Sequence, residues 1–431
     1  MMLLDQKQAG FADAFRALVE GRREETADVR AVVAEIIAAV RAEGDAAVLR
    51  FTERFDRLKL AAGGLRFSAQ ELAAARAACS PAALDALGLA AERIRAFHER
   101  QLPQDDAYVD ARGVTLGLRW RPIDAVGLYV PGGTAAYPSS VLMNAIPARV
   151  AGVQRLVMVV PTPDGAVNPL VLAAAGIAGV DEIYRIGGAQ AVAALAYGTA
   201  AIAPVDKIVG PGNAYVAEAK RQVFGRVGID MIAGPSEVVV VAEPVADPAW
   251  IAADLLSQAE HDEKAQAILI TDDRIFAERV AAAVEAQLAA LERGSIARAS
   301  WQAHGAIIVV NRLDEADRLV DALAPEHLEL IGPRAEALAA TIRHAGAIFM
   351  GAFTPEVIGD YVGGPNHVLP TSRTARFASG LAVYDFLKRT TLLGCDPASF
   401  RALAPAAAVL ARAEGLEAHA LAVERRLGGE G

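Results

Sequence analysis

The first hundred residues show the apolar spacing of amphipathic helices. Apolar positions within 29–47 recur every three or four residues, which places them on one helical face. Ser80-Pro81 combines an N-cap residue with a proline at the first helical position, so we expect a helix from there to about Arg100. The last fifty residues are rich in alanine and are also predicted to be helical.

From about Val114 the pattern changes, because short apolar runs begin to alternate with alanine-rich stretches. The runs predicted as buried strands are 155–160, 182–186, 207–209, 237–242, 266–271, 306–310, 328–332 and 347–350. The stretches predicted as helices are 169–178, 189–197, 214–223, 248–260, 274–292, 315–323 and 333–345. Alternating strands and helices indicate an α/β fold with parallel sheets.

Composition narrows the class of protein. The 431 residues are 54% hydrophobic and 22% charged, and a chain of this length can form two cores. A net charge of -10 without a block of Lys and Arg argues against a nucleic-acid partner. Two cysteines, Cys79 and Cys395, cannot form a disulfide framework, and no apolar run is long enough for a membrane span. We therefore expect a cytoplasmic protein.

Two segments contain candidate metal ligands. Gln258 and His261 stand three residues apart on a predicted helix, so both could bind one ion, although a solvated helix end has the same residue types. Asp360 and His367 lie in a glycine-rich segment whose backbone could approach a ligand closely. Either residue could be a ligand, and a plain turn is the alternative.

Two further pairs could take part in catalysis. Glu326 and His327 precede a predicted strand, and an imidazole with a carboxylate beside it suits proton abstraction from an alcohol. A pair on a surface loop is the simpler interpretation. Glu414 and His419 lie near the C-terminus, where an exposed helix explains both.

Three glycine turns follow predicted strands of one sheet. They contain Tyr129 before Gly132-Gly133, Gln190 after Gly187-Gly188, and Asn213 after Gly210-Pro-Gly. None matches the G-x-G-x-x-G fingerprint. Ligands of open α/β sheets bind at the carboxyl ends of the strands, so a cofactor crevice is favoured over simple turns. The composition of these turns does not identify the nucleotide.

Taken together, the segments around these residues resemble the histidinol dehydrogenase family. The resemblance covers about 114–419 and includes Leu256-Ser-Gln-Ala-Glu-His-Asp, Pro325-Glu-His-Leu, Gly359-Asp-Tyr-Val-Gly-Gly-Pro-Asn-His and Glu414-Gly-Leu-Glu-Ala-His. No single motif is decisive, but their order and spacing are highly specific. The first hundred residues are less distinctive.

The resemblance implies an enzyme that oxidises L-histidinol to L-histidine through the aldehyde with two NAD, as a homodimer with one zinc per subunit. Glu326 and His327 would be catalytic, and His367 would shape its loop. The implied zinc ligands are Gln258, His261, Asp360 and, from the partner subunit, His419. Substrate contacts would be these ligands with Ser236, His327 and Glu414, and NAD contacts would be Tyr129, Gln190 and Asn213. Relatives that oxidise another small diol, such as a sulfopropanediol, are the alternative.

The implied architecture is two Rossmann-like α/β domains of an incomplete nucleotide-binding type, with helical terminal segments, in an intertwined homodimer. The expected parts are an N-terminal helical arm (1–23), a first α/β domain (24–128 with 239–381), a second α/β domain on the NAD side (129–238) and a C-terminal helical tail reaching the partner subunit (382–431).

Overall fold

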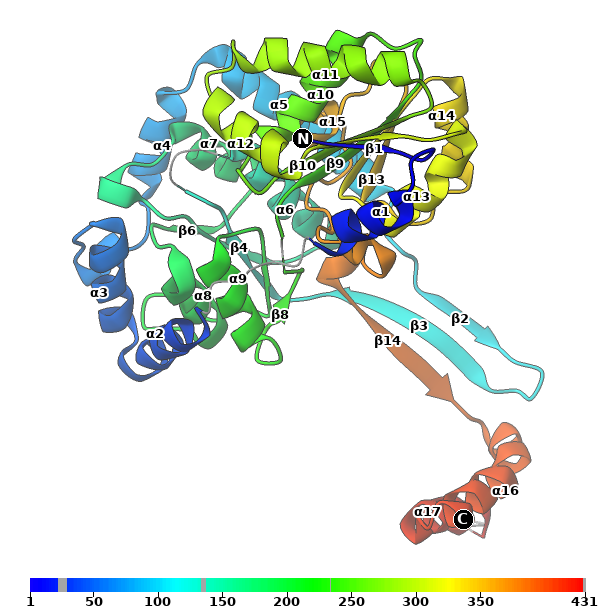
Figure 1. The fold of residues 1–431 in the computed structure, drawn as a ribbon. Coiled ribbons are helices and arrows are strands. Elements are labelled where there is room, and N and C mark those ends of the chain that lie inside the picture. Colours follow the sequence, from blue (N-terminus) through cyan, green and yellow to red (C-terminus); the bar gives the residue numbers. More distant parts are fainter. Residues whose placement is uncertain (22–28, 133–136, 233, 429–431) are drawn as a thin grey trace.

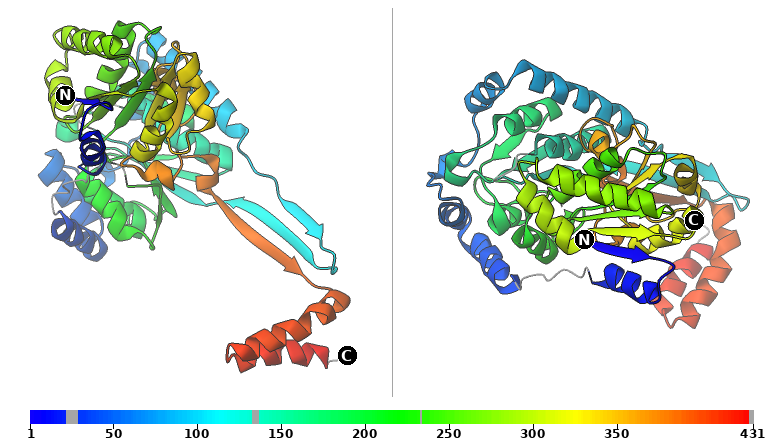
Figure 2. Two further views of the ribbon diagram at one scale, coloured as in Figure 1. Left: turned by 45° about the vertical axis from the view of Figure 1, so that its right-hand side comes forward. Right: turned by 45° about the horizontal axis from the view of Figure 1, so that its top comes forward.

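The computed structural model describes residues 1–21, 29–132, 137–232 and 234–428 (Figure 1). They form two parallel sheets, each covered by helices on both faces, and an antiparallel arm that extends away from the body (Figures 1 and 2). Within the described residues, no helix is both long and apolar enough to span a bilayer.

The larger sheet has six parallel strands. Their order is β1 (Met2–Asp5), β11 (Ala306–Val309), β10 (Gln266–Thr271), β9 (Glu237–Ala242), β12 (His327–Ile331) and β13 (Ala347–Met350). β9 is apolar on both faces of the sheet. Val238 and Val240 pack into the core on one face, and Val239 and Val241 pack into the core on the other. One face carries α10 (Pro248–Ala259), α11 (Arg274–Leu288) and α12 (Gly294–His304), and the other carries α1 (Phe11–Glu20), α13 (Ala316–Leu323) and α14 (Pro333–Ala337).

The smaller sheet has five parallel strands. Their order is β6 (Glu182–Tyr184), β5 (Arg155–Val159), β4 (Ala125–Tyr129), β7 (Lys207–Val209) and β8 (Gly228–Ile229). One face is covered by α5 (Pro81–Glu99), α6 (Pro138–Ala151) and α7 (Pro169–Ala178), with α4 (Ala69–Ala77) against α7. The other is covered by α2 (Arg30–Glu43), α3 (Asp45–Asp56), α8 (Gly188–Tyr197) and α9 (Ala214–Val223).

The arm is a three-stranded antiparallel sheet in the order β14 (Leu387–Gly394), β3 (Thr115–Pro122) and β2 (Asp106–Val109). β14 leads to α16 (Pro397–Ala413) and α17 (Glu417–Leu427), which pack against each other at the far end of the arm (Figures 1 and 2). The short helix α15 (Glu356–Tyr361) follows β13.

The structure confirms the α/β fold and every predicted strand from 155 to 350, but four details differ. Residues 2–5 of the N-terminal arm form an edge strand, and the C-terminal tail, predicted as helical, contains β14 before its two helices. The predicted helix 333–345 ends at Ala337. The sequence groups 24–128 with 239–381, yet α2 contacts α8 and α9, and α5 contacts α6, so these helices cover the smaller sheet. Such contacts join distant segments, which local periodicity does not encode.

Candidate active site

A cleft lies where the two sheets face each other. It is lined by residues after the carboxyl ends of β4 and β7 and by residues at the amino ends of β9 and β12, and it has a cavity volume of about 460 Å³. The cleft brings together many of the residues singled out from the sequence: Asn213, Ser236, His261, Glu326, His327, Asp360 and His367. Polar side chains that are far apart in the chain therefore converge on one space.

His327 is the first residue of β12 and is 4% exposed. Its Nδ1 is 3.1 Å from both the Glu237 carbonyl oxygen and Gln258 Oε1. Both of those atoms accept hydrogen bonds, so Nδ1 carries the proton in the neutral ring. Nε2 lies 3.5 Å from Asp360 Oδ1 and has no hydrogen-bond partner among the described residues. Nε2 is therefore the nitrogen of this ring that is left for a substrate or other ligand.

Carboxylates surround this imidazole. Burial opposes its charged form, but Glu326, Glu356 and Asp360 together raise the pKa of His327 well above its ordinary value. Glu326 Oε2 accepts a hydrogen bond from the Glu237 amide at 3.0 Å and lies 3.8 Å from His327 Nδ1. Burial raises the pKa of Glu326 to about 7, which suits a group that exchanges protons near neutral pH.

The predicted metal ligands of the body lie beside His327. Gln258 is fully buried in the last turn of α10, and its Nε2 donates to Nδ1 of His261 at 2.9 Å. Burial lowers the pKa of His261 and so favours the neutral imidazole that a metal requires. The charge of Asp360, on α15, raises the same pKa but is the smaller effect. No cluster of three or more His, Cys, Asp or Glu suited to a metal occurs in the described residues. The candidate set here contains two such residues, His261 and Asp360, since its third member, Gln258, is an amide.

This donor set fits zinc, which takes nitrogen and oxygen ligands and needs a fourth position filled. His367 supports the loop that carries one of the donors. Its Nδ1 donates to the Asp360 carbonyl oxygen at 2.9 Å, and its Nε2 lies 3.2 Å from the Ser140 hydroxyl.

The turns with the predicted NAD contacts meet at the carboxyl edge of the smaller sheet. The Tyr129 hydroxyl accepts a hydrogen bond from the Gly188 amide at 3.0 Å, and burial raises the pKa of Tyr129 to about 12, so the phenol stays neutral. A Cβ on Gly210 would lie 2.1 Å from the Tyr129 carbonyl oxygen, which explains the glycine. Gln190 is 1% exposed in the first turn of α8. Asn213 caps α9 by accepting from Tyr215 and Val216.

Glu414 and His419 are not brought into this cleft within one chain. Both side chains are exposed at the α16–α17 end of the arm, which lies apart from the body (Figures 1 and 2).

Sequence reasoning missed a buried acidic group behind His327. Glu329 and Glu356 are 0% and 1% exposed, and the Glu356 amide donates to Glu329 Oε1 at 2.6 Å. Burial raises the pKa of Glu356 to about 8 and that of Asp254 to about 6. A glutamate within the apolar run His-Leu-Glu-Leu-Ile was a signal for Glu329, whereas nothing in the sequence marked Glu356.

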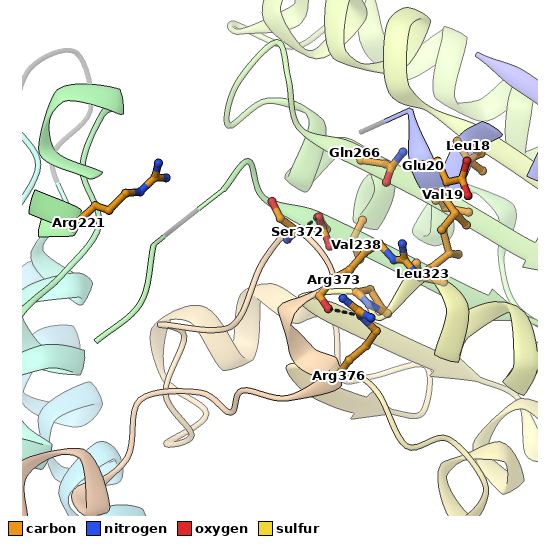
Figure 3. A pocket seen from close by; sticks show the side chains of 14 residues that line it. Leu18, Val19, Glu20, Arg221, Val238, Gln266, Leu323, Ser372, Arg373 and Arg376 are labelled. Atoms are coloured by element: carbon orange, nitrogen blue, oxygen red, sulfur yellow. Dashed lines mark hydrogen bonds between the residues drawn. The ribbon is translucent and has the colours of Figure 1, made fainter. Parts of the chain in front are cut away.

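A second hollow, of about 450 Å³, lies at the amino ends of β9 and β10. Ser372, Arg373 and Arg376 line it from one side, and Leu18 and Glu20 at the end of α1 line it from another (Figure 3). It contains none of the site residues predicted from the sequence.

Comparisons with known proteins identify the family of this chain. The family model described as histidinol dehydrogenase matches residues 19–427. Histidinol dehydrogenases of Rhodospirillum rubrum and Ruegeria pomeroyi are 65% and 64% identical over 425 and 424 residues, covering 98% of each chain. The crystal structure of histidinol dehydrogenase from Elizabethkingia anophelis has a TM-score of 0.94 at 36% identity, covering 99% of this chain and 98% of that one. This chain belongs to the histidinol dehydrogenase family.

Proposed function

We propose that this protein oxidises L-histidinol to L-histidine through L-histidinaldehyde with two molecules of NAD, the last steps of histidine biosynthesis. The observation that carries the proposal is the buried Glu326–His327 pair, whose free Nε2 faces the cleft, in a chain 61–65% identical to curated histidinol dehydrogenases. This identity favours histidinol over another small diol as the substrate. A cytoplasmic location is part of the same proposal and follows from the biosynthetic role.

The two residues divide the proton chemistry between them. His327 Nε2 accepts the hydroxyl proton of the alcohol while a hydride from the alcohol carbon passes to NAD. Glu326 takes a proton from the water that hydrates the aldehyde, and His327 is again the base when the hydrate loses the second hydride. The hydrogen bond from His327 Nδ1 to the Glu237 carbonyl oxygen keeps the ring in the tautomer that this role needs.

Zinc is part of the proposal. Gln258, His261 and Asp360 would hold it together with His419 of the partner subunit, and Ser236 and Glu414 would contact the substrate. When bound, zinc supplies a Lewis-acidic anchor for the substrate's imidazole and amine, so that the alcohol carbon is oriented toward NAD. Tyr129, Gln190 and Asn213 would contact NAD.

The arm supports the proposed homodimer. Its apolar side chains are open to solvent, since Leu393 is 71% exposed, Val409 68% and Leu410 64%. A surface of this kind indicates a protein partner. A second copy of the chain would cover it and would bring Glu414 and His419 of one subunit to the cleft of the other.

The activity is tested with zinc-loaded protein, L-histidinol and NAD. We expect two NADH for each histidinol oxidised, and a folded, zinc-loaded protein that forms no NADH would refute the proposed reaction.

The shared site is tested by mixing two inactive variants, Glu326→Gln and His419→Asn, under conditions that exchange subunits. Random pairing gives heterodimers with one intact site each, so about a quarter of the sites should become active. A mixture that stays inactive would contradict the contribution of His419 from the partner subunit, and unmixed variants are the controls.

A further inference from the structure

Asp56 is a buried carboxyl that the proposed reaction does not use. It ends α3, is 8% exposed, and has no hydrogen-bond partner among the described residues, with Oδ2 fully shielded from solvent. Burial raises its pKa, and the neighbouring Arg57 only partly opposes that rise. Buried carboxyls are normally hydrogen-bonded, so an unpartnered one calls for a partner outside the chain, such as a ligand, an ion or water.

The surroundings of Asp56 place it at the predicted cofactor crevice. α3 packs against α8 and against the short helix η2 (Pro163–Gly165), which belongs to the turn after β5. Tyr129 ends the neighbouring strand β4, and its hydroxyl is bonded to the first residue of α8. Burial is the main cause of the raised pKa of Tyr129, and the charge of Asp56 adds a smaller contribution, so the two groups lie within electrostatic range of each other.

Two other buried side chains at this edge also lack partners. Gln190 Oε1 on α8 and Thr162 Oγ1 after β5 belong to residues that are 1% exposed, and neither atom has a hydrogen-bond partner in the part of the chain that is described. A Cβ on Gly187 would lie 2.4 Å from Cβ of Pro161, so the turns themselves are tightly packed. Each of these three oxygens could accept a hydrogen bond from a hydroxyl group.

Charge at the crevice favours hydroxyls over a phosphate. Arg57, the cation next to Asp56, is held by Asp164 in a two-bond ion pair with its Nε 2.8 Å from Oδ1. Arg57 and Asp164 both have a φ of 54°, which is a strained conformation for residues other than glycine. Their ion pair joins the end of α3 to the turn after β5. The guanidinium charge is therefore already neutralised, while the carboxyl of Asp56 remains available as an acceptor.

We propose that Asp56 accepts hydrogen bonds from the ribose hydroxyls on the adenosine side of NAD and thereby selects NAD over NADP. The proposal rests on the proposed function, since it assumes that NAD binds at this edge. A carboxylate that binds a ribose 2′-hydroxyl is a general way to recognise NAD, and the 2′-phosphate of NADP would place a second anion against it. Here the carboxylate comes from the end of a helix outside the βαβ units.

The test compares dissociation constants for NAD and NADP, measured by calorimetry without histidinol, for the wild-type chain and Asp56→Asn. Losing a hydrogen bond to a charged group should weaken NAD binding by about tenfold or more, and the preference for NAD over NADP should shrink by at least about tenfold. The matched control is Asp45→Asn, which removes the same charge from the first turn of α3 and should leave the preference unchanged.

A ligand-side measurement keeps the proposal testable if the Asn variant is poorly folded. NAD lacking the adenosine 2′-hydroxyl should bind the wild-type chain about tenfold more weakly than NAD. Equal affinity for the two dinucleotides, or an unchanged NAD preference in folded Asp56→Asn, would overturn the role of Asp56 and leave the proposed oxidation standing. A wild-type chain that binds neither dinucleotide would refute both.

Discussion

The buried ion pair between Lys220 and Asp230 fixes the turn that carries Asn213. Its side chains are 3% and 1% exposed. Lys220 Nζ donates to the Gly210 carbonyl oxygen at 3.0 Å, and the Gly210 amide donates to Asp230 at 2.7 Å. Replacing Lys220 with Met keeps most of the side-chain volume but leaves the Asp230 carboxylate buried without its cation.

An uncompensated buried charge of this kind costs about 3–5 kcal/mol of stability. The exposed pair Arg50–Glu43, whose side chains are 50% and 43% exposed, should contribute far less to stability, because water and salt screen its charges. Lys220→Met should therefore be far more destabilising than Arg50→Met, although each removes one positive charge. Adding Asp230→Asn to Lys220→Met should recover part of the loss, because an amide oxygen can still accept from Gly210 without carrying a charge.

Urea unfolding at a fixed protein concentration measures the difference in stability between the two variants, and NAD affinity reports on the turn itself. We expect Lys220→Met to lower both the free energy of unfolding and the NAD affinity, since the Gly210–Asn213 turn loses one of its two anchors. A loss of stability no larger than that of Arg50→Met would refute the assignment of Lys220 and Asp230 as a buried pair that fixes the turn.

Three further predictions follow from other contacts. His327→Asn should lower turnover by about 10²-fold or more, since it removes the base, while calorimetry should find NAD affinity unchanged. His261→Asn should reduce the zinc content of purified protein, measured by atomic absorption, whereas His304→Asn should not, because His304 lies outside the cleft. Hydrogen bonds from Ser68 and Arg185 lower the pKa of Glu71 from 4.5 to about 2, so its contribution to stability is complete above the higher value and is lost as pH falls toward the lower one. Glu71→Gln should therefore reduce the pH dependence of the unfolding free energy, measured with urea between pH 4.5 and about 2. An unchanged pH dependence would contradict the lowered pKa of Glu71.

The secondary structure was largely predictable because it is encoded locally. Asn168 before Pro169 and Asp247 before Pro248 cap their helices with side-chain hydrogen bonds, as the residue types indicate. The position of a helix on one sheet or the other depends on contacts between distant segments, so the predicted grouping of 24–128 with 239–381 did not anticipate that α2 and α5 pack on the smaller sheet. β1 was missed because four residues at a sheet edge leave no periodic signal.

The candidate site was predictable where spacing or order supplied the signal. His261 lies just past the end of α10 and not on the helix face that the spacing predicted, but its ring still meets Gln258. Glu326 directly precedes β12 and His327 begins it, as the sequence indicated. The carboxyls of Asp56 and Glu356 could not be predicted, because an isolated acidic residue is read as exposed unless its tertiary neighbours are known. Their burial depends on α3 packing against η2 and on α15 packing against β12.

His419 is a residue whose proposed role in the zinc site is not evident from its neighbours in the sequence. Considered by itself, the Glu414–His419 segment indicates a solvated helix, and within one chain that interpretation is correct, since both side chains are exposed. The body meanwhile gathers the Gln258 amide, the His261 imidazole and the Asp360 carboxylate beside His327, and this proposed donor set is one short of the four that zinc prefers. An exposed imidazole on an apolar arm and an incomplete donor set in the body are complementary deficits. In the proposed homodimer a second copy of the same chain would correct both, so the dimer and the metal site are best tested together.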